Sequence, residues 1–355
     1  MFSRSQIFIF FLLLVIILFR YFSLKPTYKN GDRVRITDQV LSEPISYSNK
    51  QLITLSGLSF YLPLFPEINY GDRVVVEGIV EDTKLKNPKL VSLDTDRGVV
   101  YDFRKKLIDF YKQSLPEPYS SLVAGMTIGS KNMPSEFWEK LKNTGTAHVV
   151  VASGTNVSLV SGFLMLILVK FIKRRLVVPI MVVFIVLYVF LSGFDPPIVR
   201  AAIMGSITLF LLYNGRPGET TAILIYTALI MLVINPFWLS DIGFILSFVA
   251  TSSLVLFQKK VNQKLSFVPG FFRENLSTSL SAQIGVSPII FVVFGQFNIL
   301  SPIINALILW TVTPTMISGI VAGVVGYFVP LVGRLILLAT YVFCFWFVKV
   351  VEFFG

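Results

Sequence analysis

The residues from Leu176 to Phe194 read LVVPIMVVFIVLYVFLSGF and include no charged side chain. A helix needs roughly 20 consecutive apolar residues to cross the hydrocarbon layer of a membrane. Comparable runs predict further spanning helices at Ile7–Phe22, Asn156–Ile172, Pro197–Tyr213, Thr220–Leu239, Ile242–Phe257, Leu276–Phe294, Leu300–Phe328 and Gly333–Phe354. These runs make about nine crossings in all, so the sequence predicts a polytopic α-helical membrane protein.

The composition agrees with a membrane-embedded chain. Hydrophobic residues occupy 54% of the 355 positions, charged residues occupy 14%, and the mean hydropathy is +0.73. In soluble domains about a quarter of the residues are charged. The sequence has one cysteine, Cys344, and one histidine, His148, so an intrachain disulfide is impossible and a metal site is not expected. We likewise expect no cofactor.

Residues 25–100 follow a different pattern, in which short alternating apolar runs are separated by Gly, Pro, Asn and Asp. Such runs are typical of β-strands joined by turns. The tetrapeptide Gly31-Asp-Arg-Val34 recurs as Gly71-Asp-Arg-Val74, and each copy is expected to form a turn that leads into a strand. The spacing suits a small barrel such as an OB-fold, and a sandwich fits as well.

The segments that flank this β insert complete the domain organisation. Residues 1–24 are expected to form an uncleaved transmembrane anchor, and residues 119–355 to form a membrane domain with about eight spanning helices. Residues 101–118 predict an amphipathic helix on the membrane surface, with Arg104, Lys105, Lys106 and Lys112 opposite Phe103, Leu107, Phe110 and Tyr111. A second such helix is predicted over residues 135–142, capped by Ser135.

The net charge of +11 belongs mainly to the membrane part. Between Lys25 and Glu117, 14 basic and 13 acidic residues give +1, and the remaining 17 basic and 7 acidic residues give +10. Basic residues occur in alternate loops, namely Lys170, Lys173, Arg174 and Arg175, then Arg216, then Lys259, Lys260 and Lys264. The positive-inside rule places these loops in the cytoplasm, and the chain before Asn156, including the β insert, on the outer side.

The most unusual stretch, GTAHVVVASGTN, occupies residues 145–156. Ser153 and Gly154 are expected to interrupt a helix, and Asn156 can cap the next one, so that free N–H groups face an entering anion. A re-entrant turn with an interfacial histidine fits equally well. His148 and Ser153 also permit a hydrolase in which the histidine activates the serine, although residues five apart on a helix do not face each other well.

Three further features are candidates for function. Arg200 lies in an apolar helix and needs a partner or a wet cavity. Asp195 and Asp241, at outer helix ends, are candidate partners. Arg200 is expected either to contact the substrate or to form a structural ion pair. Two helices have stripes of small or polar residues, which indicate close packing or, less often, pore lining: Gly243, Ser247 and Thr251, then Ser277, Ser281, Gly285 and Pro288 with Gln283 nearby. The β insert offers core aromatics or base-stacking platforms in Tyr47, Phe60, Tyr61, Phe65 and Tyr70.

Five motifs occur in order along the helical part. They are Leu122–Gly129 followed by HVVVASG at 148–154, Ser192-Gly193 through Arg200–Met204, Gly215-Arg216, Asn235-Pro236 with Asp241–Phe248, and Ala282–Pro288 with Phe294–Asn305. Together with the β insert behind an N-terminal anchor, they resemble the ComEC competence proteins over nearly the whole chain. These proteins carry single-stranded DNA across the bacterial inner membrane.

The resemblance implies a channel for single-stranded DNA in the cytoplasmic membrane, used during DNA uptake and formed by residues 119–355. It implies that the entry and path are lined or shaped by His148, Ser153, Gly154, Asn156, Asp195, Arg200, Asp241, Ser247, Gln283 and Pro288. The partners it implies are single-stranded DNA, the lipid bilayer, a DNA receptor, a separate nuclease, and a cytoplasmic motor or DNA-binding protein.

Two departures from the family pattern bear on this interpretation. Asn156 stands where the family often has a second histidine, and the sequence ends at Gly355 without the metallo-β-lactamase-like domain that many members carry. We therefore expect no enzymatic activity, with a separate nuclease degrading the second strand. The rival interpretations are an intramembrane hydrolase that uses Ser153 and a transporter of a small anionic or lipid substrate.

Overall fold

The computed structural model describes residues 4–24, 28–46, 49–96, 98–151, 154–216, 218–295, 298 and 300–355. The chain divides into two compact units. The first consists of Met1–Pro26, Leu164–Ile185 and Pro196–Ala306, and the second of Thr27–Phe163, Val186–Asp195 and Leu307–Gly355. Each unit is described by itself.

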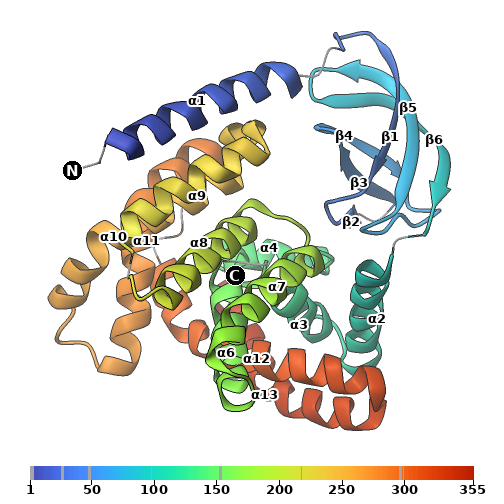
Figure 1. The fold of residues 1–355 in the computed structure, drawn as a ribbon. Helices are drawn as coiled ribbons and strands as arrows, with labels where there is room; N and C mark the ends of the chain where they lie inside the picture. The colour runs from blue at the N-terminus through green and yellow to red at the C-terminus, as the bar shows by residue number, and fades with distance from the viewer. Residues whose placement is uncertain are drawn as a thin grey trace. The chain divides into compact units, whose positions relative to one another are not determined.

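The second unit begins with a six-stranded sheet in the order β1-β5-β6-β4-β3-β2 (Figure 1). Its strands are β1 (Arg33–Gln39), β2 (Ile45–Ser46), β3 (Lys50–Leu55), β4 (Leu58–Pro63), β5 (Arg73–Glu81) and β6 (Lys84–Asp94). β4 and β6 pair in parallel and the other neighbours pair antiparallel. The expected strand-rich insert is confirmed, whereas its closure into a barrel and its OB-fold identity stay predictions.

The repeated tetrapeptide forms the same turn twice. In both copies the glycine has φ of +95°, and the aspartate accepts a hydrogen bond at 2.7 Å from the backbone N–H three residues before it. The N–H of Gly31 donates to the carbonyl of Val80, and that of Gly71 to the carbonyl of Val40, both at 2.8 Å. The turn at Gly31 thus holds the end of β5, and the turn at Gly71 holds the end of β1. The prediction of two turns leading into strands is confirmed.

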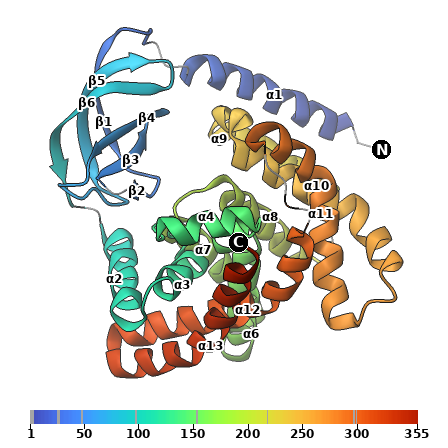
Figure 2. The ribbon, with the colours of Figure 1, turned by 180° about the vertical axis from the view of Figure 1, so that it is seen from behind.

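The helices of the second unit surround α3 (Tyr119–Ile128), whose residues from Ser120 to Ile128 are all buried. The others are α2 (Val99–Ser114), α4 (Ser135–Asn143), α5 (Ala147–Val150), the start of α6 (Gly154–Phe171), the end of α7 (Arg174–Ser192), most of α12 (Ser301–Phe328) and α13 (Pro330–Phe354). Figure 2 shows α12 and α13 side by side. The Trp346 ring N–H of α13 donates to the Leu307 carbonyl of α12 at 2.9 Å.

Helix α2 packs against a row of glycines on α12. The Tyr111 hydroxyl donates to the Gly319 carbonyl at 3.0 Å, and a Cβ atom added at Gly323 would lie 2.5 Å from that hydroxyl oxygen. A Cβ atom at Gly326 would lie 2.3 Å from the ring of Phe110. Small residues of this kind let membrane helices approach closely, so the apolar side of α2 is buried against α12.

Two details of the predicted surface helices are wrong. Arg104 was expected on the polar side of α2, but it is 2% exposed, because it precedes the buried Leu107 and Tyr111 by three and seven residues and therefore shares their face. Ser135 was expected to cap the second helix. It is instead the first residue of α4, and no side chain caps this helix, whose N-cap residue is Pro134.

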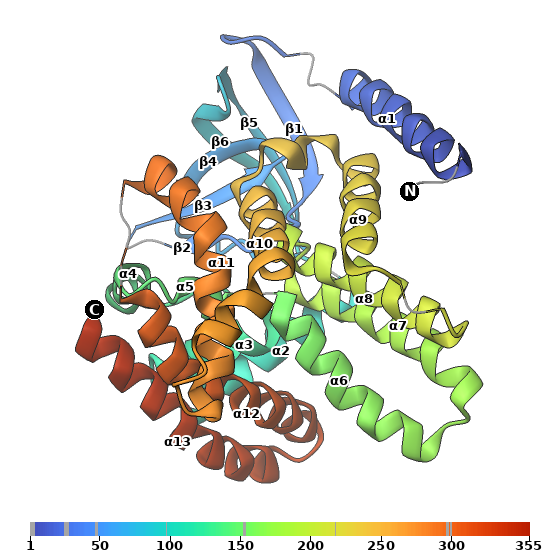
Figure 3. The ribbon, with the colours of Figure 1, turned by 90° about the vertical axis from the view of Figure 1, so that its left-hand side faces the viewer.

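The first unit contains α1 (Arg4–Leu24), α8 (Pro196–Tyr213), α9 (Thr220–Ile234), the 3-10 helix η1 (Pro236–Ser240), α10 (Ile242–Lys264) and α11 (Gly270–Phe294). Helices α10 and α11 form an antiparallel hairpin (Figure 3). The predicted helix Thr220–Leu239 is divided, because Pro236 has no N–H to continue α9. The side-chain oxygen of Asn235 accepts from the Phe237 N–H at 3.0 Å and starts η1.

Within the described residues, 7 helices are long and apolar enough to cross a membrane. Helix α9, the part Phe11–Leu24 of α1, and α3 are shorter apolar helices. Seven of the predicted spans are therefore confirmed as helices that could cross a membrane, while the total of about nine crossings stays a prediction.

Candidate functional site

The interruption predicted at Ser153 and Gly154 stays a prediction, because residues 152 and 153 lie outside the described residues. Helix α5 ends at Val150 and α6 begins at Gly154. His148 lies on α5 and Asn156 in the first turn of α6. Ser153 lies outside the described residues, so the hydrolase pair that it would form with His148 is not described.

The buried C-terminus of α3 holds three other segments together. The last carbonyls of a helix have no partner within the helix. Here the carbonyl of Met126 accepts from the Asn156 side-chain amide at 3.0 Å, and that of Thr127 from the Tyr188 hydroxyl at 3.1 Å. The carbonyl of Ile128 accepts from the Arg104 guanidinium. Asn156 is fully buried, so its observed role is to join α6 to α3.

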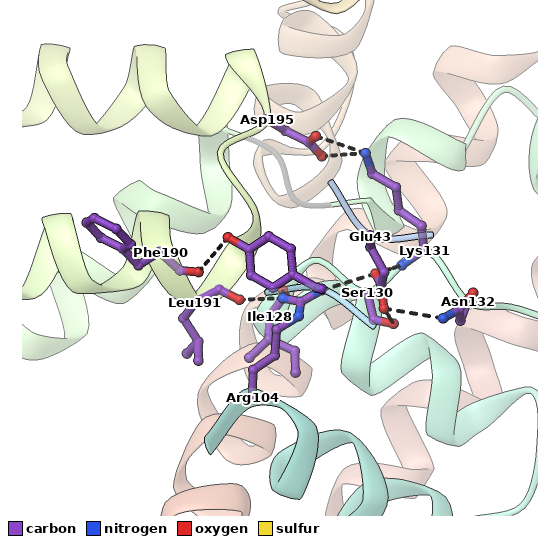
Figure 4. Close-up of polar contacts among 10 residues, drawn as sticks. Glu43, Arg104, Ile128, Ser130, Lys131, Asn132, Phe190, Leu191 and Asp195 are labelled. Atoms are coloured by element: carbon purple, nitrogen blue, oxygen red, sulfur yellow. Dashed lines mark hydrogen bonds and ion pairs between the residues drawn. The ribbon is translucent and has the colours of Figure 1, made fainter. Parts of the chain in front are cut away.

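Arg104 is the centre of a polar cluster that includes the β insert (Figure 4). Its Nη1 also donates to the Leu191 carbonyl. Its Nη2 lies 3.1 Å from Glu43 Oε2, and the two side chains are only 3% and 7% exposed. The Tyr70 ring lies 5.1 Å from the guanidinium carbon, a cation–π distance. The positive charge also faces the negative end of the α3 dipole, which is favourable.

The Tyr70 side chain is itself fixed, because its hydroxyl donates to the Phe190 carbonyl at 3.0 Å. Burial raises the pKa of the Tyr70 phenol above its ordinary value of 10.0. The hydroxyl therefore stays protonated, and able to donate, at any physiological pH. Tyr70, in the turn before β5, thus connects the sheet to the helices of the second unit. Glu43, on the connection between β1 and β2, does the same (Figure 4).

The Glu43 carboxylate accepts four hydrogen bonds. Oε1 accepts from Ser130 Oγ at 2.8 Å and from Asn132 Nδ2 at 3.4 Å. Oε2 accepts from the Lys131 backbone N–H at 2.6 Å and from Arg104 at 3.1 Å. Three of these donors come from the loop between α3 and α4. The Lys131 ammonium points to another partner, Asp195, at 2.8 Å, as Figure 4 shows.

In the first unit, Arg200 joins α8 to α10. Its Nη1 donates to the Ser247 carbonyl at 2.8 Å and to the Thr251 hydroxyl. The two carboxylates expected as its partners, Asp195 and Asp241, make other contacts. Asp195 pairs with Lys131, and Asp241 Oδ1 accepts from the Phe244 N–H at 2.8 Å and so caps α10. A carbonyl and a hydroxyl thus accept from Nη1 of this half-buried guanidinium without neutralising its charge.

The stripe of small residues on α11 brings that helix close to α10 at Gly285. The stripe on α10 lies toward α8 instead, because Ser247 and Thr251 accept from Arg200. A Cβ atom at Gly285 would lie 2.0 Å from Ser253 Oγ and 3.0 Å from Val249 Cγ1. The Ser281 hydroxyl donates to the Ser277 carbonyl of its own helix at 2.6 Å. At these positions the geometry supports helix packing.

The sequence of the helical part matches a known protein family. The family model described as Competence protein matches residues 126–355. The chain belongs to this family. Because it also has 7 long apolar helices among its described residues, this competence-family chain is a multi-pass membrane protein.

Two curated proteins are similar to part of the chain. ComE operon protein 3 of Bacillus subtilis (strain 168) is 31% identical over 228 residues, which cover 63% of this chain and 29% of that protein. An uncharacterized protein of Aquifex aeolicus (strain VF5) is 27% identical over 197 residues, 55% of this chain and 44% of that protein. The matched regions span less than half of either relative. No solved structure matches the chain.

The candidate residues of this competence-family chain fall into two groups. His148, Gly154, Asn156 and Asp195 belong to the second unit, and Arg200, Asp241, Ser247, Gln283 and Pro288 to the first. Within the first group, the Asn156 side chain donates a hydrogen bond to α3, and Asp195 forms an ion pair with Lys131. Within the second group it brings Arg200 to Ser247. On α11, Gln283 is half-buried and Pro288 is exposed.

Sequence reasoning missed the cluster formed by Glu43, Arg104 and Lys131. The helical position of Arg104 relative to Leu107 and Tyr111 was a usable signal, because an arginine on an apolar face needs a buried partner. Glu43 gave no such signal, since it lies in an irregular connection far from Arg104 in sequence.

The candidate stacking residues of the β insert also separate into two groups. Phe60 and Tyr70 are buried, whereas Tyr61 is 52% and Phe65 78% exposed. Tyr47 lies outside the described residues. The core assignment is therefore confirmed for Phe60, whereas Tyr70 is buried against the helices of the second unit. The stacking assignment stays a prediction for Tyr61 and Phe65.

Proposed function

We propose that this chain forms a channel for single-stranded DNA across the cytoplasmic membrane during DNA uptake, with the β insert on the outer side. The observation that carries the proposal is the match of the Competence protein family over residues 126–355, which reaches from α3 to the last helix. The similarity to ComE operon protein 3 of Bacillus subtilis supports it.

The distribution of charge suits a polyanionic substrate. A nucleic acid strand has one negative charge per nucleotide, and proteins bind it chiefly through Lys and Arg. Apart from the nearly neutral segment between Lys25 and Glu117, the chain has a net charge of +10. Arg200, held inside an apolar helix by a carbonyl and a hydroxyl, keeps its positive charge without a counter-ion in these contacts. Such a charge can attract a phosphate.

The β insert supplies a different kind of contact. Exposed aromatic rings bind successive bases of a single strand by stacking, independently of sequence. Tyr61 and Phe65 have the exposure that this role requires. We therefore assign to the insert the guidance of the strand toward the helices.

The partners that the proposal requires are those of a DNA-uptake machine. They are single-stranded DNA, a DNA receptor on the outer side, a separate nuclease, and a cytoplasmic motor or DNA-binding protein. The sequence has no glycine-rich nucleotide-binding motif followed by Lys and Ser or Thr. The energy for transport is accordingly assigned to a partner.

An uptake assay with Arg200→Ala tests the proposal. We expect the variant to insert into the membrane, as judged by its level in washed membranes, and to lose uptake of fluorescently labelled DNA into the cytoplasm. Arg334→Ala is the matched control, because Arg334 is exposed on α13, and it should transport normally. Normal uptake by Arg200→Ala would remove Arg200 from the path, and normal uptake by cells without the chain would reject the channel itself.

A further inference from the structure

The cluster around Glu43 has the composition of an anion-binding site. Its donors are the guanidinium of Arg104, the hydroxyl of Ser130, the backbone N–H of Lys131 and the side-chain amide of Asn132. Guanidinium, hydroxyl, amide and backbone N–H groups are also the donors that proteins use to bind phosphate oxygens. In this structure all four bind a carboxylate that belongs to the chain itself.

The donors are held in place independently of Glu43. Arg104 also donates to the carbonyls of Ile128 and Leu191, and its guanidinium lies 5.1 Å from the centre of the Tyr70 ring. The other three donors follow directly after α3, whose Gly129 ends the helix with φ of 69°. The N–H of Ser130 donates back to the Ala124 carbonyl at 3.3 Å. The loop that presents these donors is therefore anchored to α3.

Glu43, by contrast, comes from a separate element. It lies on the connection between β1 and β2 of the sheet, whereas all four donors lie on α2 and on the loop between α3 and α4. A shift of the β1–β2 connection would remove the carboxylate and leave the donors in their positions. It would also expose a site that is covered in this structure, since the Glu43 and Arg104 side chains are 7% and 3% exposed.

The charges of the cluster are balanced only when Glu43 is present. Two basic side chains, Arg104 and Lys131, meet two acidic ones, Glu43 and Asp195. Without Glu43 the cluster has one uncompensated positive charge, on a buried guanidinium, and an uncompensated buried charge is strongly unfavourable. The vacated site therefore favours another monovalent anion with two oxygens that accept hydrogen bonds.

We propose that Glu43 occupies a phosphate-binding site from within the chain, and that a phosphodiester of the incoming single strand exchanges with it. A phosphodiester resembles a carboxylate in the relevant respect, because two oxygens share one negative charge. Exchange frees the β1–β2 connection and so couples arrival of the strand to movement of the β insert. This proposal rests on the proposed function for the identity of the ligand, but the anion site can be tested without it.

The first test uses the full chain, purified in an alkyl maltoside without phospholipid, and inorganic phosphate as the probe. In chloride, Glu43→Gln should have a lower melting temperature than the unaltered chain. Phosphate at equal ionic strength should reverse most of this decrease in melting temperature. Adding Ser130→Ala to Glu43→Gln should remove this response. The control is Glu81→Gln, which removes one exposed carboxylate from the same sheet and should behave as the unaltered chain does.

The second test uses a fluorescent oligothymidylate in the same detergent. We expect it to bind Glu43→Gln at least about tenfold more tightly than the unaltered chain, because the internal competitor is gone. Phosphatidylglycerol is the comparison ligand. If it stabilises Glu43→Gln and the oligonucleotide does not, the ligand is a lipid headgroup and the proposal is wrong.

The remaining outcomes are also decisive. If phosphate has no effect on Glu43→Gln beyond its effect on Glu81→Gln, or if Glu43→Gln cannot be purified in chloride or in phosphate, the cluster is a structural ion pair only. If cells without the chain still take up DNA while Glu43→Gln responds to phosphate, the channel function fails and the anion site stands. If cells without the chain lose uptake and Glu43→Gln shows no phosphate response, the channel function stands and the anion site fails.

Discussion

Replacing Arg104 with leucine should destabilise the chain far more than the same change at the adjacent lysine. The substitution leaves the Glu43 carboxylate, 7% exposed, without its charged partner, and breaking a buried pair in this way costs about 3–5 kcal/mol. The carbonyls of Ile128 and Leu191 also lose a donor, at roughly 1–3 kcal/mol for each one left unsatisfied. We expect a net loss of at least about 3 kcal/mol, since repacking and entering water recover part of the total.

The assay is equilibrium unfolding in mixed micelles, with SDS as the denaturant and tryptophan fluorescence as the signal. Lys105→Leu is the matched control, because Lys105 is exposed on the same turn of α2, and it should change the unfolding free energy by no more than about 0.5 kcal/mol. The double variant Glu43→Leu with Arg104→Leu removes both charges. Its unfolding free energy should fall by less than the sum of the decreases in the two single variants, with a coupling energy of about 2 kcal/mol.

Two results would refute this reasoning. Equal decreases in unfolding free energy for Arg104→Leu and Lys105→Leu would show that the ion pair and hydrogen bonds of Arg104 do not stabilise the chain. Strict additivity of the two single changes would show that Glu43 and Arg104 do not interact, in conflict with the 3.1 Å distance between Glu43 Oε2 and Arg104 Nη2.

Three further predictions follow from single contacts. Asn156→Leu should lower the unfolding free energy by about 1–3 kcal/mol, because the Met126 carbonyl loses its donor, whereas the exposed Ser158→Leu should change it little; equal effects would count against the bond. Gly285→Val should lower the melting temperature by forcing α10 from α11, and Gly162→Val, where a Cβ meets nothing within 4 Å, should not. Phe65→Ser should weaken binding of a fluorescent single-stranded oligonucleotide to the full chain by about 1–3 kcal/mol if one base stacks there, and unchanged anisotropy would exclude that contact.

The cluster around Glu43 shows where prediction from sequence ends. Arg104 could have been placed on the buried face of α2 from its spacing to Leu107 and Tyr111, because helical periodicity is a local property. Its partner could not, since Glu43 is 61 residues away and lies in a connection without periodicity. The pairing depends on how the sheet packs on the helices.

The partner of Arg200 shows the same limit. The sequence indicated that a buried arginine needs polar contacts, and it offered two carboxylates at helix ends. The structure supplies the Ser247 carbonyl and the Thr251 hydroxyl instead. The Arg200 side chain bonds to the acceptors on the helix that α8 packs against. That helix is α10, and the packing is a property of the tertiary structure.

The sequence by itself determined the properties that depend on composition and local period. These are the apolar spans, the strand-rich insert, and the repeated turns at Gly31 and Gly71. Each follows from the chemistry of consecutive residues, because lipid demands long apolar helices and a positive φ favours glycine. Only the tertiary structure decided which side chains end the buried α3 and which donors surround Glu43. Those contacts join segments far apart along the chain, and no local pattern records them.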